Sequence, residues 1–191
     1  MKELIYKLLD ILSMGKGLKR TVNGHTLRLP TRYFKYFPKN YESENFEFLS
    51  NSCKPGAVVI DIGAHIGLFS VVASQITGKT GKVYAFEPAP DTFALLQKTI
   101  VINHEEQVIE PIQKAVGKEN GKITFFITDN KADNANSLVN YRDESSLHGI
   151  DVTVTSVDDF VKEKNINKLD FIKIDVEGAE FDTLQGAAAT F

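Results

Sequence analysis

The stretch Val58-Val59-Ile60-Asp61-Ile62-Gly63-Ala64-His65-Ile66-Gly67-Leu68-Phe69-Ser70 decides the fold of this chain. Its first half is a short apolar run rich in β-branched residues, which predicts a buried parallel strand. After the second glycine the apolar residues recur at helical spacing, which predicts a helix. A strand that turns through glycines into a helix presents free backbone N–H groups at one point. We therefore expect a ligand site at this turn, and its predicted binding residues are Asp61, Gly63, Ala64, His65 and Gly67.

A second apolar run, residues 82–86, predicts the next strand of a βαβ unit and ends at Glu87 and Pro88. An acidic side chain at that tip is placed to accept both hydroxyl groups of a ribose. The turn lacks the Gly-x-Gly-x-x-Gly pattern of dinucleotide sites and the Lys-Ser/Thr pair of triphosphate sites. An acidic loop end repels phosphate and suits a neutral or cationic ligand. S-adenosylmethionine fits these requirements, because it has a sulfonium, an ammonium and a ribose but no phosphate.

Three blocks of the sequence, residues 61–67, 86–88 and 172–180, resemble the FkbM family of S-adenosylmethionine-dependent methyltransferases. The resemblance runs from about residue 41 to the end of the sequence. It implies an α/β fold, the Rossmann-like doubly wound sheet of class I methyltransferases. It also implies an O-methyltransferase acting on a hydroxyl group of a sugar or a secondary metabolite. The same fold hosts N-methylation, so the acceptor atom rests on analogy alone.

The third and fourth strands are predicted at residues 108–116 and 168–175. Pro111 favours an edge position for the third strand, in agreement with a sheet order of 3-2-1-4. At its end, Ala115 and Val116 are predicted either to face an adenine ring or to pack within the sheet.

The tip of the fourth strand carries the carboxylates of Asp175 and Glu177, next to the first strand and at the switch point where ligands bind. We expect Asp175 to act as the base for the acceptor or to orient it, with Glu177 as the second candidate. For Asp175, binding of the ammonium of S-adenosylmethionine or capping of the following helix stays an open alternative.

An insertion separates the third and fourth strands. Residues 122–127 predict a strand that pairs antiparallel with residues 152–155. The long polar loop between them contains Asn134, Asn136 and Ser137, which resemble an Asn/Ser element of the family. These groups suit a sugar-like acceptor, with an exposed loop as the open alternative.

The N-terminal part is expected to form a separate segment, residues 1–52, before a cofactor-binding domain of residues 53–191. Residues 1–14 predict a helix, and we favour docking on the domain or on a partner chain over an interfacial membrane helix, because its polar face is not strongly basic. Asn23-Gly24 predicts a hairpin that covers an end or an edge of the sheet. The aromatic residues of 31–38 either line an acceptor pocket or pack the hairpin, and Glu42 is a weak site candidate.

Composition restricts the classes of function. The chain is 42% hydrophobic with a formal net charge of −3, so it has a core but no basic field for nucleic acid. Its one cysteine, Cys53, fits a reducing compartment, and we expect a cytoplasmic protein. No apolar stretch is long enough for a signal peptide or a membrane span, and no motif demands a metal.

The sequence stops soon after the fourth predicted strand, whereas the resemblance implies strands five to seven as well. We expect that a missing C-terminal segment or an oligomeric partner covers the free edge of the fourth strand, and we favour a fragment. Two other functions stay open. One is a non-catalytic binding module with this fold, and the other is an NAD-dependent oxidoreductase of Rossmann type.

Overall fold

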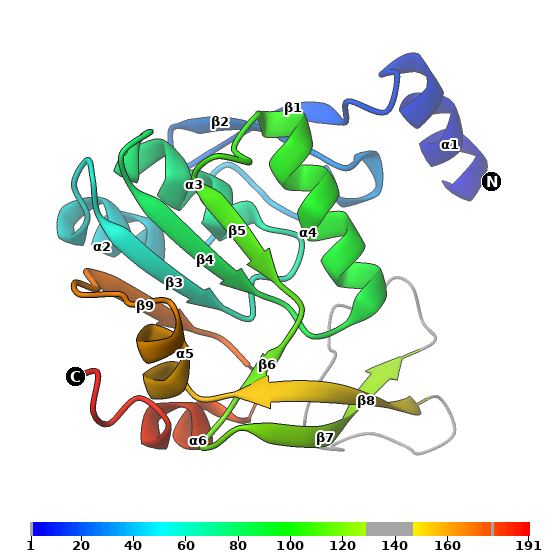
Figure 1. Ribbon diagram of the computed structural model, residues 1–191. Helices are drawn as coiled ribbons and strands as arrows, with labels where there is room; N and C mark the ends of the chain where they lie inside the picture. The colour runs from blue at the N-terminus through cyan, green and yellow to red at the C-terminus, as the bar shows by residue number, and fades with distance from the viewer. Residues whose placement is uncertain (1, 129–146, 177) are drawn as a thin grey trace.

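The computed structural model describes residues 2–128, 147–176 and 178–191, and its main sheet holds four parallel strands (Figure 1). In sheet order they are β5 (Ile109–Ile112), β4 (Lys82–Phe86), β3 (Val58–Ile62) and β9 (Phe171–Ile174). This arrangement confirms the predicted order 3-2-1-4. Ile62 lies opposite both Phe86 and Ile174, so three strands end in line at one side of the sheet. Ligands bind at that side in open α/β sheets.

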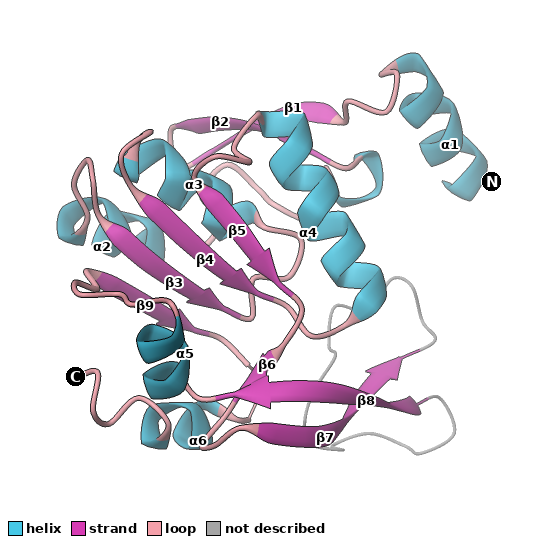
Figure 2. Ribbon diagram, viewed as in Figure 1, coloured by secondary structure: helices cyan, strands magenta, loops and turns pink. Residues whose placement is uncertain are grey.

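Helices cover both faces of this sheet, because its strands send alternate side chains into two cores (Figure 2). Val59 joins Val71 in the core under α3 and α4, whereas Ile60 and Ile62 join Phe160 in the core under α5. The helices are α2 (Ser43–Ser52), α3 (Leu68–Thr77), α4 (Pro90–Asn103), α5 (Val157–Glu163) and α6 (Glu180–Gln185). The fold is therefore the doubly wound α/β class that the sequence predicts.

Residues 108–116 do not form one strand, contrary to the prediction. β5 ends at Ile112, whose carbonyl accepts a hydrogen bond from the N–H of Lys114 (3.0 Å), and this tight turn interrupts the ladder. The chain then enters a second sheet, whose strands in order are β6 (Ala115–Val116), β8 (Leu147–Thr155) and β7 (Gly121–Thr128). β7 and β8 are antiparallel, which confirms the pairing predicted for residues 122–127 and 152–155.

The hairpin predicted at Asn23 and Gly24 is present, but it covers helices and not an end or an edge of the sheet. It consists of β1 (Leu18–Val22) and β2 (His25–Leu29). The N–H of Arg28 donates to Asn103 Oδ1 (2.7 Å), and Asn103 Nδ2 donates back to Arg28 O (2.8 Å). Gln75 of α3 also donates to the backbone of β2 (3.1 Å). These bonds fix the hairpin as an outer layer over α3 and α4.

The N-terminal helix α1 (Lys2–Leu12) contacts the domain, as predicted, but through polar groups. It lies beside η1 (Thr31–Tyr33), where Thr31 Oγ1 donates to Asp10 Oδ1 (3.3 Å). Asp10 also pairs with Lys98 of α4 (3.2 Å). Its apolar side is exposed, with Leu4, Ile5, Leu8, Ile11 and Leu12 between 50% and 73% accessible. The docked face is therefore the polar one, which the apolar spacing does not reveal.

The predicted division at residue 52 falls inside one hydrophobic core. Leu29, Phe46 and Leu49 belong to the same buried cluster as Val59 and Val71. The N-terminal segment thus packs as part of the body that carries the sheet, and its separation into a domain of its own remains a prediction.

Candidate active site

A pocket opens at the carboxyl ends of β3, β4 and β9, where the strands end in line. Eight of the predicted site residues line it, namely Gly63, Ala64, His65, Glu87, Pro88, Ala115, Val116 and Asp175. Asp61 and Gly67 do not line it. Glu177 lies outside the described residues, as do Asn134, Asn136 and Ser137. The structure therefore brings most of the predicted residues together, although they come from four separate parts of the chain.

Glu87 holds a buried carboxylate at the tip of β4, with 6% of the residue exposed. Its Oε2 accepts the N–H of His65 (3.1 Å) and its Oε1 accepts the N–H of Ala89 (3.0 Å). Both bonds favour the charged form, but burial outweighs them and raises the pKa of Glu87 to about 7. Each carboxylate oxygen keeps a further lone pair, so Glu87 can accept hydrogen bonds from a ligand.

His65 is neutral at physiological pH. Burial, with a smaller contribution from the nearby Lys173 ammonium, lowers its pKa to about 4. Its ring packs edge-on against Tyr33, with the ring centroids 5.6 Å apart. His65 therefore offers the pocket a backbone N–H and an uncharged ring, and it adds no positive charge.

Asp61 lies behind the pocket and not beside the ligand. Because side chains alternate along β3, it points toward α3, where it is fully buried and accepts a hydrogen bond from Ser70 Oγ (2.6 Å). Its other oxygen lies 3.4 Å from Lys173 Nζ. We therefore revise its predicted role from direct contact to support of Lys173.

Lys173 joins Asp61 to the pocket. Its ammonium lies 3.3 Å from Asp175 Oδ2 and donates to the carbonyl of Gly63 (3.3 Å). Burial alone lowers the pKa of Lys173, but the two carboxylates outweigh it and raise the pKa above its ordinary value. Three oxygens thus lie around the charged Lys173 ammonium: the Gly63 carbonyl accepts its hydrogen bond, and Asp61 and Asp175 pair with its charge. One oxygen of Asp175 is held in this way while its side chain stays 61% exposed.

The two glycines of the turn serve packing inside the protein. Gly63 has a φ of +77°, and a Cβ there would overlap the backbone oxygen of Asp175. Gly67 has a φ of +87°, and a Cβ there would lie 2.6 Å from Leu96 Cδ1 of α4. Gly63 is therefore required by the close approach of Asp175, the residue that follows β9.

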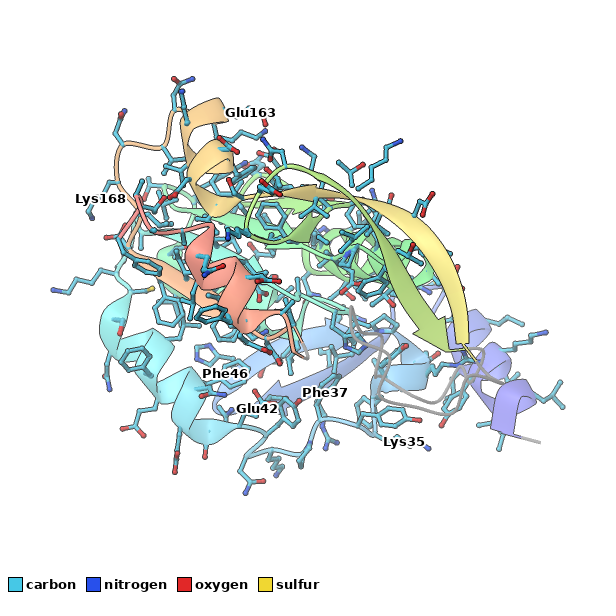
Figure 3. The ribbon with its side chains drawn as sticks, turned by 90° about the horizontal axis from the view of Figure 1, so that it is seen from below. Lys35, Phe37, Glu42, Phe46, Glu163 and Lys168 are labelled. Atoms are coloured by element: carbon cyan, nitrogen blue, oxygen red, sulfur yellow. The ribbon has the colours of Figure 1, made fainter. Side chains whose placement is uncertain are left out.

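The N-terminal segment supplies one wall of the pocket, formed by Phe37, Tyr41, Glu42 and Phe46. Figure 3 shows Phe37, Glu42 and Phe46 of the N-terminal segment on the same side of the molecule. We call residues 37–46 the N-terminal wall. Burial and a hydrogen bond to Glu42 raise the pKa of Tyr41, so its hydroxyl stays protonated. Phe37 lines the pocket and is also buried in one cluster with Val22 and Leu29 of the hairpin, so both interpretations hold for this ring, and Glu42 lies at the pocket.

The hairpin holds the N-terminal wall in place. Arg20 Nε donates to Phe37 O (2.8 Å), and Asn23 Nδ2 donates to Tyr41 O (2.6 Å). The backbone N–H of Asn23 donates to Lys39 O (2.7 Å). The turn residue that the sequence marks for the hairpin therefore also positions the pocket.

Sequence reasoning missed Lys173 and Phe125, which also line the pocket. A signal for Lys173 exists in Ile172-Lys173-Ile174-Asp175, because a lysine within a buried apolar strand requires a partner. Phe125 carries no comparable signal, since its place depends on the second sheet.

The model of the methyltransferase FkbM domain matches residues 61–191. The chain belongs to the FkbM methyltransferase family. Its match begins at Asp61 and contains every predicted site residue except the weak candidate Glu42, which belongs to the N-terminal wall.

Curated relatives share modest identity with this FkbM-family chain. A 31-O-demethyl-FK506 methyltransferase of Streptomyces tacrolimicus is 30% identical over an alignment of 160 positions, and the match covers 70% of this chain and 60% of the relative. A hexuronic acid methyltransferase of Haloferax volcanii is 25% identical over 145 residues, which are 76% of this chain and 56% of the relative. The chain thus spans less than two thirds of the length of these relatives.

Solved structures overlap with this FkbM-family chain only in part. A Pyrococcus horikoshii TYW2 in complex with MeSAdo has a TM-score of 0.40 and 26% identity, over 51% of this chain and 35% of that one. In the part of the chain that the structure describes, no helix is long and apolar enough to cross a membrane. Those same residues contain no group of three or more His, Cys, Asp or Glu side chains placed to hold a metal ion.

Proposed function

We propose that this chain binds S-adenosylmethionine in the pocket at the strand tips and transfers a methyl group to a hydroxyl group of a sugar or a secondary metabolite. Membership of the FkbM methyltransferase family supports the reaction class. The two relatives are named for methyl transfer to an oxygen of FK506 and to a hexuronic acid, which supports hydroxyl acceptors of these kinds.

The observation that best supports S-adenosylmethionine as the cofactor is the buried carboxylate of Glu87. It sits at the tip of the second strand, on the pocket lining, with its two oxygens held by the N–H groups of His65 and Ala89. A carboxylate in this position accepts the two hydroxyls of a ribose. The space beside Gly63 is filled by the backbone of Asp175, so the turn has no free glycine face for a pyrophosphate. This arrangement favours S-adenosylmethionine over NAD.

The chain's own residues divide the pocket into a cofactor part and an acceptor part. When bound, S-adenosylmethionine supplies an electrophilic methyl group. Glu87 would hold its ribose, Ala115 and Val116 would flank its adenine, and the turn from Gly63 to His65 would face its methionine end. These residues fit the group, because an apolar slot and a hydrogen-bond acceptor adjoin at one place.

Asp175 is the described residue best placed to handle the acceptor. Lys173 holds one of its oxygens, and the exposed remainder of the carboxylate can accept a hydrogen bond from a hydroxyl group. An acceptor hydroxyl loses its proton during methyl transfer, and a fixed carboxylate within reach helps that loss. The aromatic N-terminal wall on the other side would exclude water. Contact with the cofactor ammonium remains the alternative role for Asp175, and Glu177 remains the second candidate base.

Calorimetry with Glu87→Gln tests the cofactor. We expect S-adenosylmethionine to bind the unmodified protein and to bind the variant at least tenfold more weakly, because an amide accepts only on one side. Glu110→Gln is the matched control, since Glu110 pairs with Lys82 and Lys164 and does not line the pocket. Binding of NAD without binding of S-adenosylmethionine would refute the proposal.

A second assay separates an enzyme from a binding module. The protein is incubated with S-adenosylmethionine labelled in its methyl group and with a hydroxylated extract from its host. We expect labelled product from the unmodified protein and little from Asp175→Asn. Cofactor binding without any transferred label would favour the non-catalytic module.

A cytoplasmic location and the absence of nucleic-acid partners stay predictions.

A further inference from the structure

The apolar face of α1 is an exposed stripe with no cover among the described residues. Leu4, Ile5, Leu8, Ile11 and Leu12 recur at i, i+1, i+4, i+7 and i+8, so they share one side of the helix. Leu4 and Ile11 are 73% and 72% exposed. Proteins that work alone in water rarely expose an apolar stripe of this kind, which marks an interaction surface.

The orientation of α1 is fixed by bonds on its opposite side. Asp10 pairs with Lys98, and Thr31 Oγ1 donates both to Asp10 and to the backbone of Tyr6 (3.4 Å). Tyr6 and Asp10 lie about 180° around the helix from the centre of the stripe. The domain therefore anchors the helix with its apolar face turned outward.

The first 39 residues, which contain α1 and the segment that follows it, are strongly basic, in contrast to the chain as a whole. Residues 1–39 contain nine Lys or Arg and two Asp or Glu, a formal charge of +7, whereas the whole chain has 22 and 25 and a formal charge of −3. Five of these cations have exposed side chains, namely Lys7, Lys16, Lys19, Lys35 and Lys39. One of the two acids, Asp10, is already paired with Lys98. A charge asymmetry of this kind indicates an anionic partner.

The basic segment and the helix lie together. Lys7 and Arg32 line one shallow hollow between α1 and η1. Arg28 Nη1 donates to the carbonyls of Lys16 (3.1 Å) and Gly17 (3.3 Å), which ties the end of the helix to β2. In Figure 3, α1 and Lys35 lie toward the same corner of the molecule.

We propose that α1 and the basic segment of residues 16–39 bind the surface of an anionic lipid bilayer, with the apolar stripe in the headgroup layer and the lysines over the lipid charges. An interfacial helix needs apolar side chains on one face and cations beside them, and this structure supplies most of the exposed cations from the following segment, with Lys7 on the helix itself. At 11 residues, about 16 Å long, α1 is too short to cross a hydrocarbon core. The surface occupant is therefore a membrane that α1 lies on.

Co-sedimentation of the full chain with vesicles tests this proposal. We use phosphatidylcholine vesicles with about 30% phosphatidylserine and vesicles of phosphatidylcholine alone, at low and at high salt. We expect at least tenfold stronger binding to the anionic vesicles, and loss of that difference at high salt, because each cation near the surface contributes about fivefold.

Two sets of variants assign the binding to this surface. Leu4→Gln with Ile11→Gln is expected to weaken vesicle binding at least tenfold, and Lys16→Gln with Lys19→Gln at least fivefold. The matched control is Phe181→Gln on α6, where the side chain is 70% exposed and lies outside the proposed surface. None of these residues lines the pocket, so binding of 5′-methylthioadenosine and the circular dichroism spectrum should not change.

Several outcomes would overturn the proposal. They are absence of binding to anionic vesicles, equal binding to both kinds of vesicle, and equal binding by the helix variants and the unmodified protein. A dimer that Leu4→Gln with Ile11→Gln dissociates, in a protein that ignores vesicles, would replace the membrane by a second copy of the chain.

Discussion

The raised pKa of Glu87 predicts that nucleoside binding depends on pH. Ribose hydroxyls donate their protons, so they bind the ionised carboxylate better than the protonated one. With a pKa of about 7, Glu87 is about 90% ionised at pH 8 and about 10% at pH 6. The dissociation constant should therefore rise about tenfold between pH 8 and pH 6, which is about 1.4 kcal/mol.

Isothermal titration calorimetry with 5′-methylthioadenosine measures this dependence cleanly. This probe contains the ribose and the adenine but no amino group, whereas the amine of S-adenosylmethionine would itself titrate near pH 8. The groups that face Glu87 do not interfere, because His65 has a pKa of about 4 and the pKa of Lys173 lies above its ordinary value. Buffers of different ionisation enthalpy should also show release of about half a proton per ligand at pH 7.

Glu87→Gln is the decisive variant for this prediction. Its amide does not titrate, so its weaker binding should be equally weak at pH 6 and pH 8. A tenfold pH dependence that persists in the variant would place the titrating group elsewhere. A flat profile in the unmodified protein would show that Glu87 does not hold the ribose or that its pKa is not raised.

Three further predictions concern stability. Gly63→Ala should lower the free energy of unfolding by about 3 kcal/mol, because of left-handed strain and overlap with the backbone of Asp175. The control Gly24→Ala, at a φ of +83° with open space around it, should lower it by about 1 kcal/mol. Thermal melting measures both losses, and equal losses would disprove the overlap. Lys173→Met should lower the free energy of unfolding by about 3–5 kcal/mol, measured in urea, because Asp61 is left buried without its cation. The double variant Lys173→Met with Asp61→Asn should recover most of that loss. No recovery would refute the pairing. Lys168→Met is the control, because the Lys168 side chain that pairs with Asp170 is 76% exposed, and it should cost below about 1 kcal/mol. Ser156→Ala should lower the free energy of unfolding by about 1 kcal/mol, because Ser156 Oγ accepts the N–H of Asp159 at the start of α5 (3.1 Å). The same variant should leave nucleoside binding unchanged, and a loss of binding would connect α5 to the pocket.

The sequence predicts the sheet well because its signals are local. The alternation and the bounding glycines define β3 and β4, and the resemblance adds the order of the strands. The same locality explains the failure at residues 108–116, where apolar residues continue past a turn and β6 leaves the sheet at Ala115. A pattern of side chains does not reveal a hydrogen bond between neighbouring backbone groups such as Lys114 and Ile112.

The site is predictable where a residue follows directly from a strand tip. Glu87 and Asp175 line the pocket for that reason. Asp61 was expected there as well, but it lies two residues before Gly63 and alternation turns it toward α3. The N-terminal wall depends on long-range bonds from Arg20 and Asn23, and no spacing within the sequence indicates them.

The bonds between the hairpin and the N-terminal wall also bear on how acceptor range can change. The residues that would meet the acceptor at Tyr41 and Glu42 precede the family-matched segment, and their backbone is held by a turn almost twenty positions earlier. Exchange of residues 18–46 as a unit with those of a relative should therefore transplant acceptor preference while the nucleoside pocket keeps its affinity. Exchange of Tyr41 and Glu42 alone, without the turn that holds the backbone of Tyr41, should not transfer the acceptor preference.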